Sequence, residues 1–163
     1  MADQSPPKTR RAIALLAVIA LSACNGVHLR SPIAPASGPP EAFVRTSSDA
    51  RATRVIELGD GTTKAAAFSA ASELLTQRFS IDVSDQHTGF LMTPWQASFS
   101  RAGAPDLHYR TRIIIRFLGD DWKQVSVRAD ANWQRGEEWD VGYDSKLLDD
   151  VITDLKSRIG KTP

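Results

Sequence analysis

Only one cysteine and three histidines occur among the 163 residues of this chain. This scarcity excludes a framework of intrachain disulfides and a cysteine-rich zinc site. The chain also lacks an excess of one charge, because 20 Lys and Arg residues stand against 19 Asp and Glu residues. Nucleic acid is therefore not an expected partner, since its binding needs a surplus of basic residues to neutralise phosphates.

Motifs for catalysis are absent as well. The sequence has no Gly-x-Ser-x-Gly elbow, no His-Glu-x-x-His zinc helix, no Gly-x-x-x-x-Gly-Lys phosphate loop and no dinucleotide fingerprint. An acidic residue and a histidine lie two positions apart in the sequence only at Asp85 with His87 and at Asp106 with His108. These pairs could form a metal or acid–base site, but turns also select Asp for local hydrogen bonds alone. We predict a non-enzymatic protein without metal or other cofactor.

Long hydrophobic runs are missing too. A membrane-spanning helix needs about 20 consecutive apolar residues, and no run in this sequence reaches that length. The longest run, residues 12–21, follows basic residues at positions 8, 10 and 11 and leads into Leu-Ser-Ala-Cys at residues 21–24. This order of segments is typical of an export signal and predicts a signal peptide over residues 1–23.

The Leu-Ser-Ala-Cys segment resembles the lipobox of bacterial lipoproteins, in which the cysteine thiol receives a diacylglyceryl group. The resemblance implies that Cys24 is the lipid attachment site and that several acyl chains, palmitate among them, anchor the mature chain in the membrane. Asn25 after the cysteine implies sorting to the outer membrane, facing the periplasm. Arg10 and Arg11 also resemble a twin-arginine export motif, so the twin-arginine and general secretory routes both stay open.

The segment that follows the cysteine is rich in proline. Residues 31–40 contain four prolines and one glycine, a composition that favours an extended and weakly structured chain. We predict a tether over residues 24–53. The alternative is a segment that becomes ordered when a partner binds it.

Residues 54–160 carry the pattern of a folded domain. Alternating apolar residues predict strands over residues 54–58, 81–84, 90–96, 109–118 and 123–133. Apolar residues at three- and four-residue spacing predict a helix over residues 64–78, capped by Thr62 or Thr63, and a second helix that begins at Asp144 or Ser145 and ends at residue 159. The helices and an antiparallel sheet can cover one another, so we predict a single two-layer α+β domain with both amphipathic helices on one sheet face.

Basic and aromatic side chains point outward from this predicted sheet. The candidate partner-binding face consists of Trp95, Arg110, Arg112, Arg116 and Arg128, with Trp122 as an alternative neighbour to Trp95. Arg and Trp are enriched in binding hot spots, although outward Arg also keeps an exposed sheet face soluble. Trp133 and Trp139 around Arg135 could stack on a sugar or pack at the edge of the core.

Three segments together suggest a family. Residues 79–83, the Gly-x-x-x-Thr-x-Trp pattern at residues 89–95 and Tyr-Arg-x-Arg at residues 109–112 resemble the helix-grip domain of the C subunit of the outer-membrane β-barrel assembly machinery. That subunit is also a lipoprotein, but it has two such domains and a longer amino-terminal segment. The resemblance implies a helix-grip-like fold and an accessory envelope function.

We therefore expect a lipid-anchored, non-catalytic module that binds envelope proteins, with a role in outer-membrane protein assembly as the resemblance implies. The alternative is a periplasm-facing carrier of a small apolar ligand or lipid, since a sheet gripped by helices can open an apolar cavity. That cavity would be lined by Phe68, Ile113, Val127, Val151 and Leu155.

Overall fold

The computed structural model describes residues 39–46, 52–99 and 105–161. All of them belong to one of the two units into which the chain divides, residues 34–163. The predicted signal peptide, the predicted lipid attachment site Cys24 and the proline-rich run at residues 31–38 lie outside the described residues.

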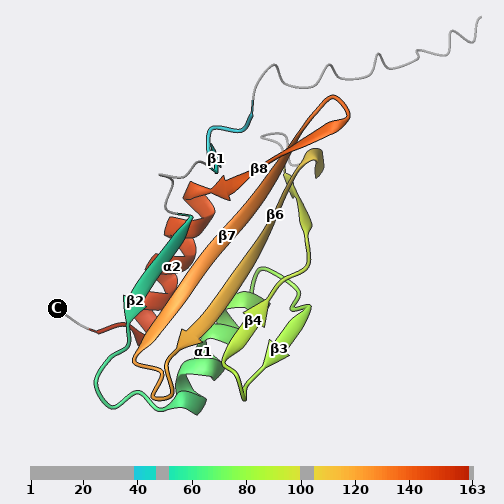
Figure 1. Ribbon diagram of the computed structural model, residues 1–163. Helices are drawn as coiled ribbons and strands as arrows, with labels where there is room; N and C mark the ends of the chain where they lie inside the picture. The colour runs from blue at the N-terminus through green and yellow to red at the C-terminus, as the bar shows by residue number, and fades with distance from the viewer. Residues whose placement is uncertain (1–38, 47–51, 100–104, 162–163) are drawn as a thin grey trace, which may run out of the picture. The chain divides into compact units, whose positions relative to one another are not determined.

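The described residues form eight strands and two helices (Figure 1). In chain order these are β1 (Phe43–Arg45), β2 (Thr53–Glu57), α1 (Lys64–Thr76), β3 (Val83–Asp85), β4 (Phe90–Met92), β5 (Gln96–Phe99), β6 (Pro105–Leu118), β7 (Gln124–Arg135), β8 (Glu138–Asp144) and α2 (Ser145–Ile159).

A long antiparallel hairpin of β6 and β7 forms the centre of the sheet, and its outer edges each carry two shorter strands. On the β7 edge, β2 pairs with residues 124–128 and β8 with residues 130–135. On the β6 edge, β4 pairs with residues 114–116 and β5 with residues 105–111. Every pairing is antiparallel, so the predicted α+β class with an antiparallel sheet is confirmed.

Both helices pack against one face of this sheet, which Figure 1 shows from its other face. Alternate residues of β6 and β7, including Ile113, Ile115, Val125 and Val127, are buried on the helix side, as the strand periodicity predicts. The five side chains of the expected apolar cavity, Phe68, Ile113, Val127, Val151 and Leu155, are all buried in the same core cluster. Within the described ranges, no helix is long and apolar enough to cross a membrane.

Each helix begins at a residue that caps it. The Thr63 side chain accepts a hydrogen bond from the Ala66 N–H, and the Asp144 carboxylate accepts one from the Leu147 N–H at 2.8 Å. Both bonds satisfy amides that the first helical turn leaves without a backbone partner. The sequence placed these starts correctly, because Thr and Asp before an amphipathic run are typical N-caps.

Strand β1 lies inside the segment expected to be a tether. It pairs with β8 from Phe43↔Asp144 to Arg45↔Gly142. The Phe43 ring meets Tyr109 edge-on at 6.1 Å, and the Arg45 guanidinium donates to Asp140 at 2.6 Å. Folded structure therefore reaches further toward the amino terminus than residue 54, and tertiary contacts with distant residues hold it there.

The expected strand at residues 90–96 is two strands, and β8 was not expected at all. Thr93 and Pro94 separate β4 from β5, because proline has no N–H for the ladder. The buried Thr93 hydroxyl accepts the Ile113 N–H at 2.9 Å and so replaces a backbone acceptor at the break. In β8, Trp139, Val141 and Tyr143 alternate with charged residues and glycine, which is a strand pattern that the sequence-based prediction overlooked.

Tyr109 connects the central hairpin to the start of α2. Its hydroxyl donates to the Asp144 carboxylate at 2.9 Å, the group that caps α2. Burial raises the pKa of Tyr109 well above its usual value, and the nearby Asp144 carboxylate raises it further. The phenol therefore stays neutral in the folded protein under conditions where an unfolded chain would ionise it.

Tyr109→Phe is expected to lower the free energy of unfolding at pH 7 by about 1.5–3 kcal/mol, the typical value for a hydrogen bond to a charged group. A pKa raised by folding contributes stability below the unfolded pKa, and this contribution is lost as the pH rises above about 10. The difference in the free energy of unfolding between wild type and variant, measured by urea denaturation, should thus be smaller above pH 10 than at pH 7. A difference that stays constant would contradict this role of Tyr109.

Candidate partner-binding face

The sheet face opposite the helices carries the basic residues that the sequence analysis selected. Arg110, Arg112 and Arg116 alternate along β6 with residues buried under the helices. The register places Arg112 opposite Asp130 and Arg116 opposite Ser126 on β7. Because side chains at i and i+2 of a strand share a face, these residues follow one line on the uncovered side. We call this side the outer face.

Two tryptophans pack against the arginines of the outer face. The Arg110 guanidinium carbon lies 5.0 Å from the ring centroid of Trp95 and 4.3 Å from that of Trp139. The corresponding distance from Arg112 to Trp95 is 4.6 Å. At such distances a guanidinium is attracted to the electron-rich indole face. We call Trp95, Arg110, Arg112, Arg128, Asp130 and Trp139 the Arg–Trp cluster.

Asp130 forms ion pairs with two arginines of the cluster, Arg112 and Arg128. One of its oxygens accepts from Nε and Nη2 of Arg112 at 3.2 and 3.1 Å. The other accepts from Nη2 of Arg128 at 2.8 Å. The Asp130 side chain is only 11% exposed, so these bonds are less screened than those of a typical surface ion pair. Two positive charges share one negative charge, and the trio keeps a net charge of +1.

Arg110 and Arg116 bring positive charge that no carboxylate of the described chain neutralises. The Nε of Arg110 is buried without a hydrogen-bond partner in the described residues. When the Asn132 amide is turned to satisfy both of its neighbours, its oxygen accepts from Arg110 Nη2 at 3.2 Å. Arg116 is exposed, and within the described ranges it makes no ion pair.

The structure thus brings together four of the five selected residues, Trp95, Arg110, Arg112 and Arg128, through direct contacts or through Asp130. Arg116 shares their face, four residues further along β6 from Arg112. Trp122 is not their neighbour: it is buried and stacked on Phe117 at 4.7 Å. The tight turn after β6 folds its ring under the sheet, so this alternative is wrong.

Trp139 belongs to the cluster although the sequence analysis paired it with Trp133 around Arg135. In the structure Trp133 packs against Phe43 at 6.4 Å, on the other side of the sheet, whereas Trp139 contacts Arg110. The β7–β8 register sets Trp139 opposite Gln134, next in line to Trp133. Strand alternation on either side of the turn at residues 136–137 places the two rings on opposite faces, but no strand was predicted after residue 133.

The two acid–imidazole pairs form local turns. The Asp85 carboxylate accepts from the Thr88 hydroxyl at 2.7 Å and from the His87 N–H at 2.8 Å, and the bonds from Thr88 hold the pKa of this exposed acid below its usual value. Asp106 accepts from the His108 N–H at 3.0 Å in the same way. The described residues contain no group of three or more His, Cys, Asp or Glu side chains placed to hold a metal ion.

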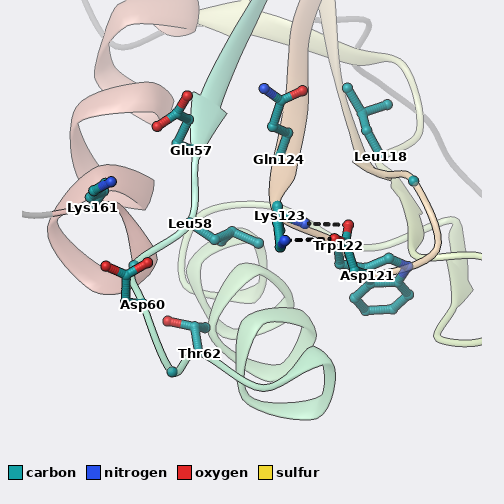
Figure 2. Close-up of a pocket in the computed structure, with 13 residues that line it drawn as sticks. Glu57, Leu58, Asp60, Thr62, Leu118, Asp121, Trp122, Lys123, Gln124 and Lys161 are labelled. Atoms are coloured by element: carbon teal, nitrogen blue, oxygen red, sulfur yellow. Dashed lines mark hydrogen bonds and ion pairs between the residues drawn. The ribbon is translucent and has the colours of Figure 1, made fainter.

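A separate pocket of about 600 Å³ lies at the turn of the β6–β7 hairpin (Figure 2). Its wall combines the loop before α1 with the hairpin turn and Lys161. Lys123 forms an ion pair with Asp121 at 3.2 Å, which with the backbone bond from Lys123 lowers the pKa of this carboxylate. The pocket is lined by the acids Glu57, Asp60 and Asp121, the lysines Lys123 and Lys161 and the apolar residues Leu58, Leu118 and Trp122, so its lining is mixed in charge and polarity.

Comparison with known proteins found no family model that matches the chain and no matching curated protein. Assignment of a role to the outer face consequently rests on its own chemistry. Rigidly held guanidinium groups and indole rings on an open sheet are suited to binding, because they lose little side-chain freedom on contact.

Proposed function

We propose that this protein is a lipid-anchored envelope lipoprotein that acts as a non-catalytic, protein-binding module through the outer face of its sheet. The proposed anchor is Cys24, supported by the lipobox-like residues 21–24 after a basic and apolar leader. The proposed contact surface is the Arg–Trp cluster with Arg116.

The observation that carries the proposal is the Arg–Trp cluster on a sheet face without a helix layer. Trp and Arg dominate binding hot spots because they combine large apolar contact areas with directed hydrogen bonds. Here three arginines are held in place by two indoles and one shared carboxylate. Arginines that serve only to keep a protein soluble do not need to be held in one position by neighbouring side chains.

Apolar side chains surround the cluster on the same face. Ile114 and Met92 are paired across β6 and β4 and are half-buried. Val55 on β2 and Val141 on β8 are 52% and 62% exposed. Protein interfaces typically combine such an apolar area with a few polar anchors, which supports a protein as the partner.

We further propose a helix-grip-like relationship and a role in outer-membrane protein assembly. The support is the resemblance of residues 89–95 and 109–112 to the C subunit of that machinery. The position of two helices on one face of an antiparallel sheet is compatible with it. Trp95 and Arg110, which carry part of the sequence resemblance, are also in contact in the cluster.

Crosslinked affinity purification of the lipidated protein from its own membranes tests this function. Arg116→Glu reverses an exposed charge of the outer face, and Lys156→Glu makes the matching change on an exposed residue of α2. We expect envelope proteins, β-barrel assembly subunits among them, to be recovered with wild type and Lys156→Glu and to be lost with Arg116→Glu. Equal recovery with both variants would rule out the outer face as the contact surface.

A Cys24→Ala form tests the anchor in the same experiment. The outer face is a second proposed attachment, so the anchor is tested with Cys24→Ala combined with Arg116→Glu. This double variant should leave the membrane fraction, whereas Arg116→Glu alone should stay in it. A double variant that stays membrane-bound would contradict lipid anchoring. Native mass spectrometry of the purified wild type examines the carrier alternative, since a bound apolar ligand would appear as added mass.

A further inference from the structure

We infer that the partner segment bound by the outer face is an acidic, extended polypeptide whose carboxylates contact Arg116 and the arginines of the Arg–Trp cluster. This inference rests on the proposed function and specifies the chemistry of its partner. It follows from the charge, the spacing and the restraint of the basic residues on this face.

Positive charge is concentrated on the central strip of the outer face, and the acids Glu57 and Asp85 lie on the same face at its edges. Residues 110–116 of β6 and 126–132 of β7 contribute four arginines and one aspartate to this face. The full chain, by contrast, has a formal net charge of only +1. The acids of α2, Asp149, Asp150 and Asp154, belong to the helix layer on the other side of the sheet. A partner segment that complements this central strip is therefore expected to be negative.

Spacing along β6 fits an extended chain. Arg110, Arg112 and Arg116 share one face of a single strand, in which each residue advances about 3.4 Å. The three arginines thus span about 20 Å in one line, the length of about seven residues of extended polypeptide. Carboxylates at alternate positions of such a segment all point to one side and can meet successive guanidinium groups.

The tryptophans argue against ligands that need a free aromatic surface. Guanidinium groups already lie against the rings of Trp95 and Trp139, and both residues are half-buried. Nucleic acid bases and sugars bind by stacking on open rings, which these contacts obstruct. Arg116 instead offers an exposed guanidinium fork, which matches the planar geometry of a carboxylate that accepts two parallel hydrogen bonds. Arg112 already donates from Nε and Nη2 to Asp130, so a partner carboxylate would meet its remaining N–H groups.

A defined acidic peptide tests the inference on the full lipidated chain in detergent. The probe is fluorescein-labelled deca-glutamate, followed by fluorescence anisotropy, with deca-lysine as the control peptide. We expect deca-glutamate to bind and deca-lysine not to bind. Arg116→Glu should weaken binding about tenfold or more, whereas Lys156→Glu should change it less than about twofold. Raising NaCl from about 0.05 to about 0.5 M should also weaken it about tenfold.

The same binding measurement, made with other anionic ligands, distinguishes a polypeptide partner from a glycan or a lipid surface. Binding of heparin or of phosphatidylglycerol vesicles with the same dependence on Arg116, but none of deca-glutamate, would overturn the inference in favour of a glycan or a lipid surface. Equal binding of deca-glutamate to wild type and Arg116→Glu would overturn it as well, because the contact would then lie elsewhere.

Failure of this inference can be distinguished from failure of the proposed function. If the crosslinked envelope partner is lost with Arg116→Glu but deca-glutamate does not bind, the partner is not recognised through carboxylates and the proposed function stands. If deca-glutamate binds as expected but no envelope protein is recovered, the outer face is an acid-binding surface and the proposed role as an envelope-protein adaptor is wrong.

Discussion

Trp122→Ala is expected to lower the free energy of unfolding by about 3–5 kcal/mol, the usual range for truncation of a buried tryptophan. The ring is stacked on Phe117 at 4.7 Å and packs against Phe68 at 6.3 Å. Removing it leaves a cavity between α1 and the turn of the central hairpin. Since single domains are stable by about 5–15 kcal/mol, this is a large fraction of the total. Urea denaturation followed by circular dichroism measures the loss.

A glycine at the same position should do less damage than alanine. Trp122 has φ +51°, in the left-handed region that costs a side chain with a Cβ about 1–2 kcal/mol. Trp122→Gly loses the same ring but relieves this strain. We expect it to be up to about 1 kcal/mol more stable than Trp122→Ala, the reverse of their order in regular strands and helices. Equal or lower stability of the glycine variant would show that the turn backbone is not strained.

Gly89→Ala is expected to destabilise the protein by about 2–5 kcal/mol, because left-handed strain and overpacking add. Gly89 has φ +67°, and a Cβ built there would lie 2.7 Å from the Trp122 ring and 2.9 Å from the Phe117 Cβ. The backbone cannot move away freely, since the Gly89 carbonyl accepts the Phe117 N–H at 2.8 Å. The alanine methyl must therefore displace the stacked pair.

Gly136→Ala is the matched control. Gly136 has φ +66°, almost the same backbone conformation, but a Cβ there would have no neighbour within 4 Å. Gly136→Ala should lower the free energy of unfolding only by the backbone strain, about 1–2 kcal/mol. The difference between the two variants in urea denaturation isolates the overlap with Trp122 and Phe117. If both lose the same stability, the aromatic pair adapts to the added methyl and the predicted rigidity is absent.

Much of the central sheet could be predicted from periodicity. Alternation in β6 and β7 assigned Ile113 and Val127 to the core and Arg112 and Arg128 to the opposite face, and the structure confirms both. The N-caps Thr63 and Asp144 were also recognisable from local residue type. Such signals are local, because strand alternation and helix capping depend on residues only a few positions apart.

The neighbours across the sheet could not be predicted in this way. Trp139 contacts Arg110, and Asp130 holds Arg112 and Arg128 together, only because β8 and β6 flank β7 in one particular register. Strand β1 forms for a similar reason: Phe43 covers Gly142, where any side chain would collide with the Phe43 ring. The residues involved are far apart in the sequence, so no local pattern marks them.

The sequence by itself determined the class of the fold, the two faces of the central strands and the basic character of the outer one. Only the tertiary structure decided which side chains on that face meet, that Trp139 joins it and that Trp122 is buried away from it. The physical reason is that hydrophobic periodicity fixes the side to which a residue points. Strand order, register and tight turns fix its neighbours, and these depend on packing across the whole domain.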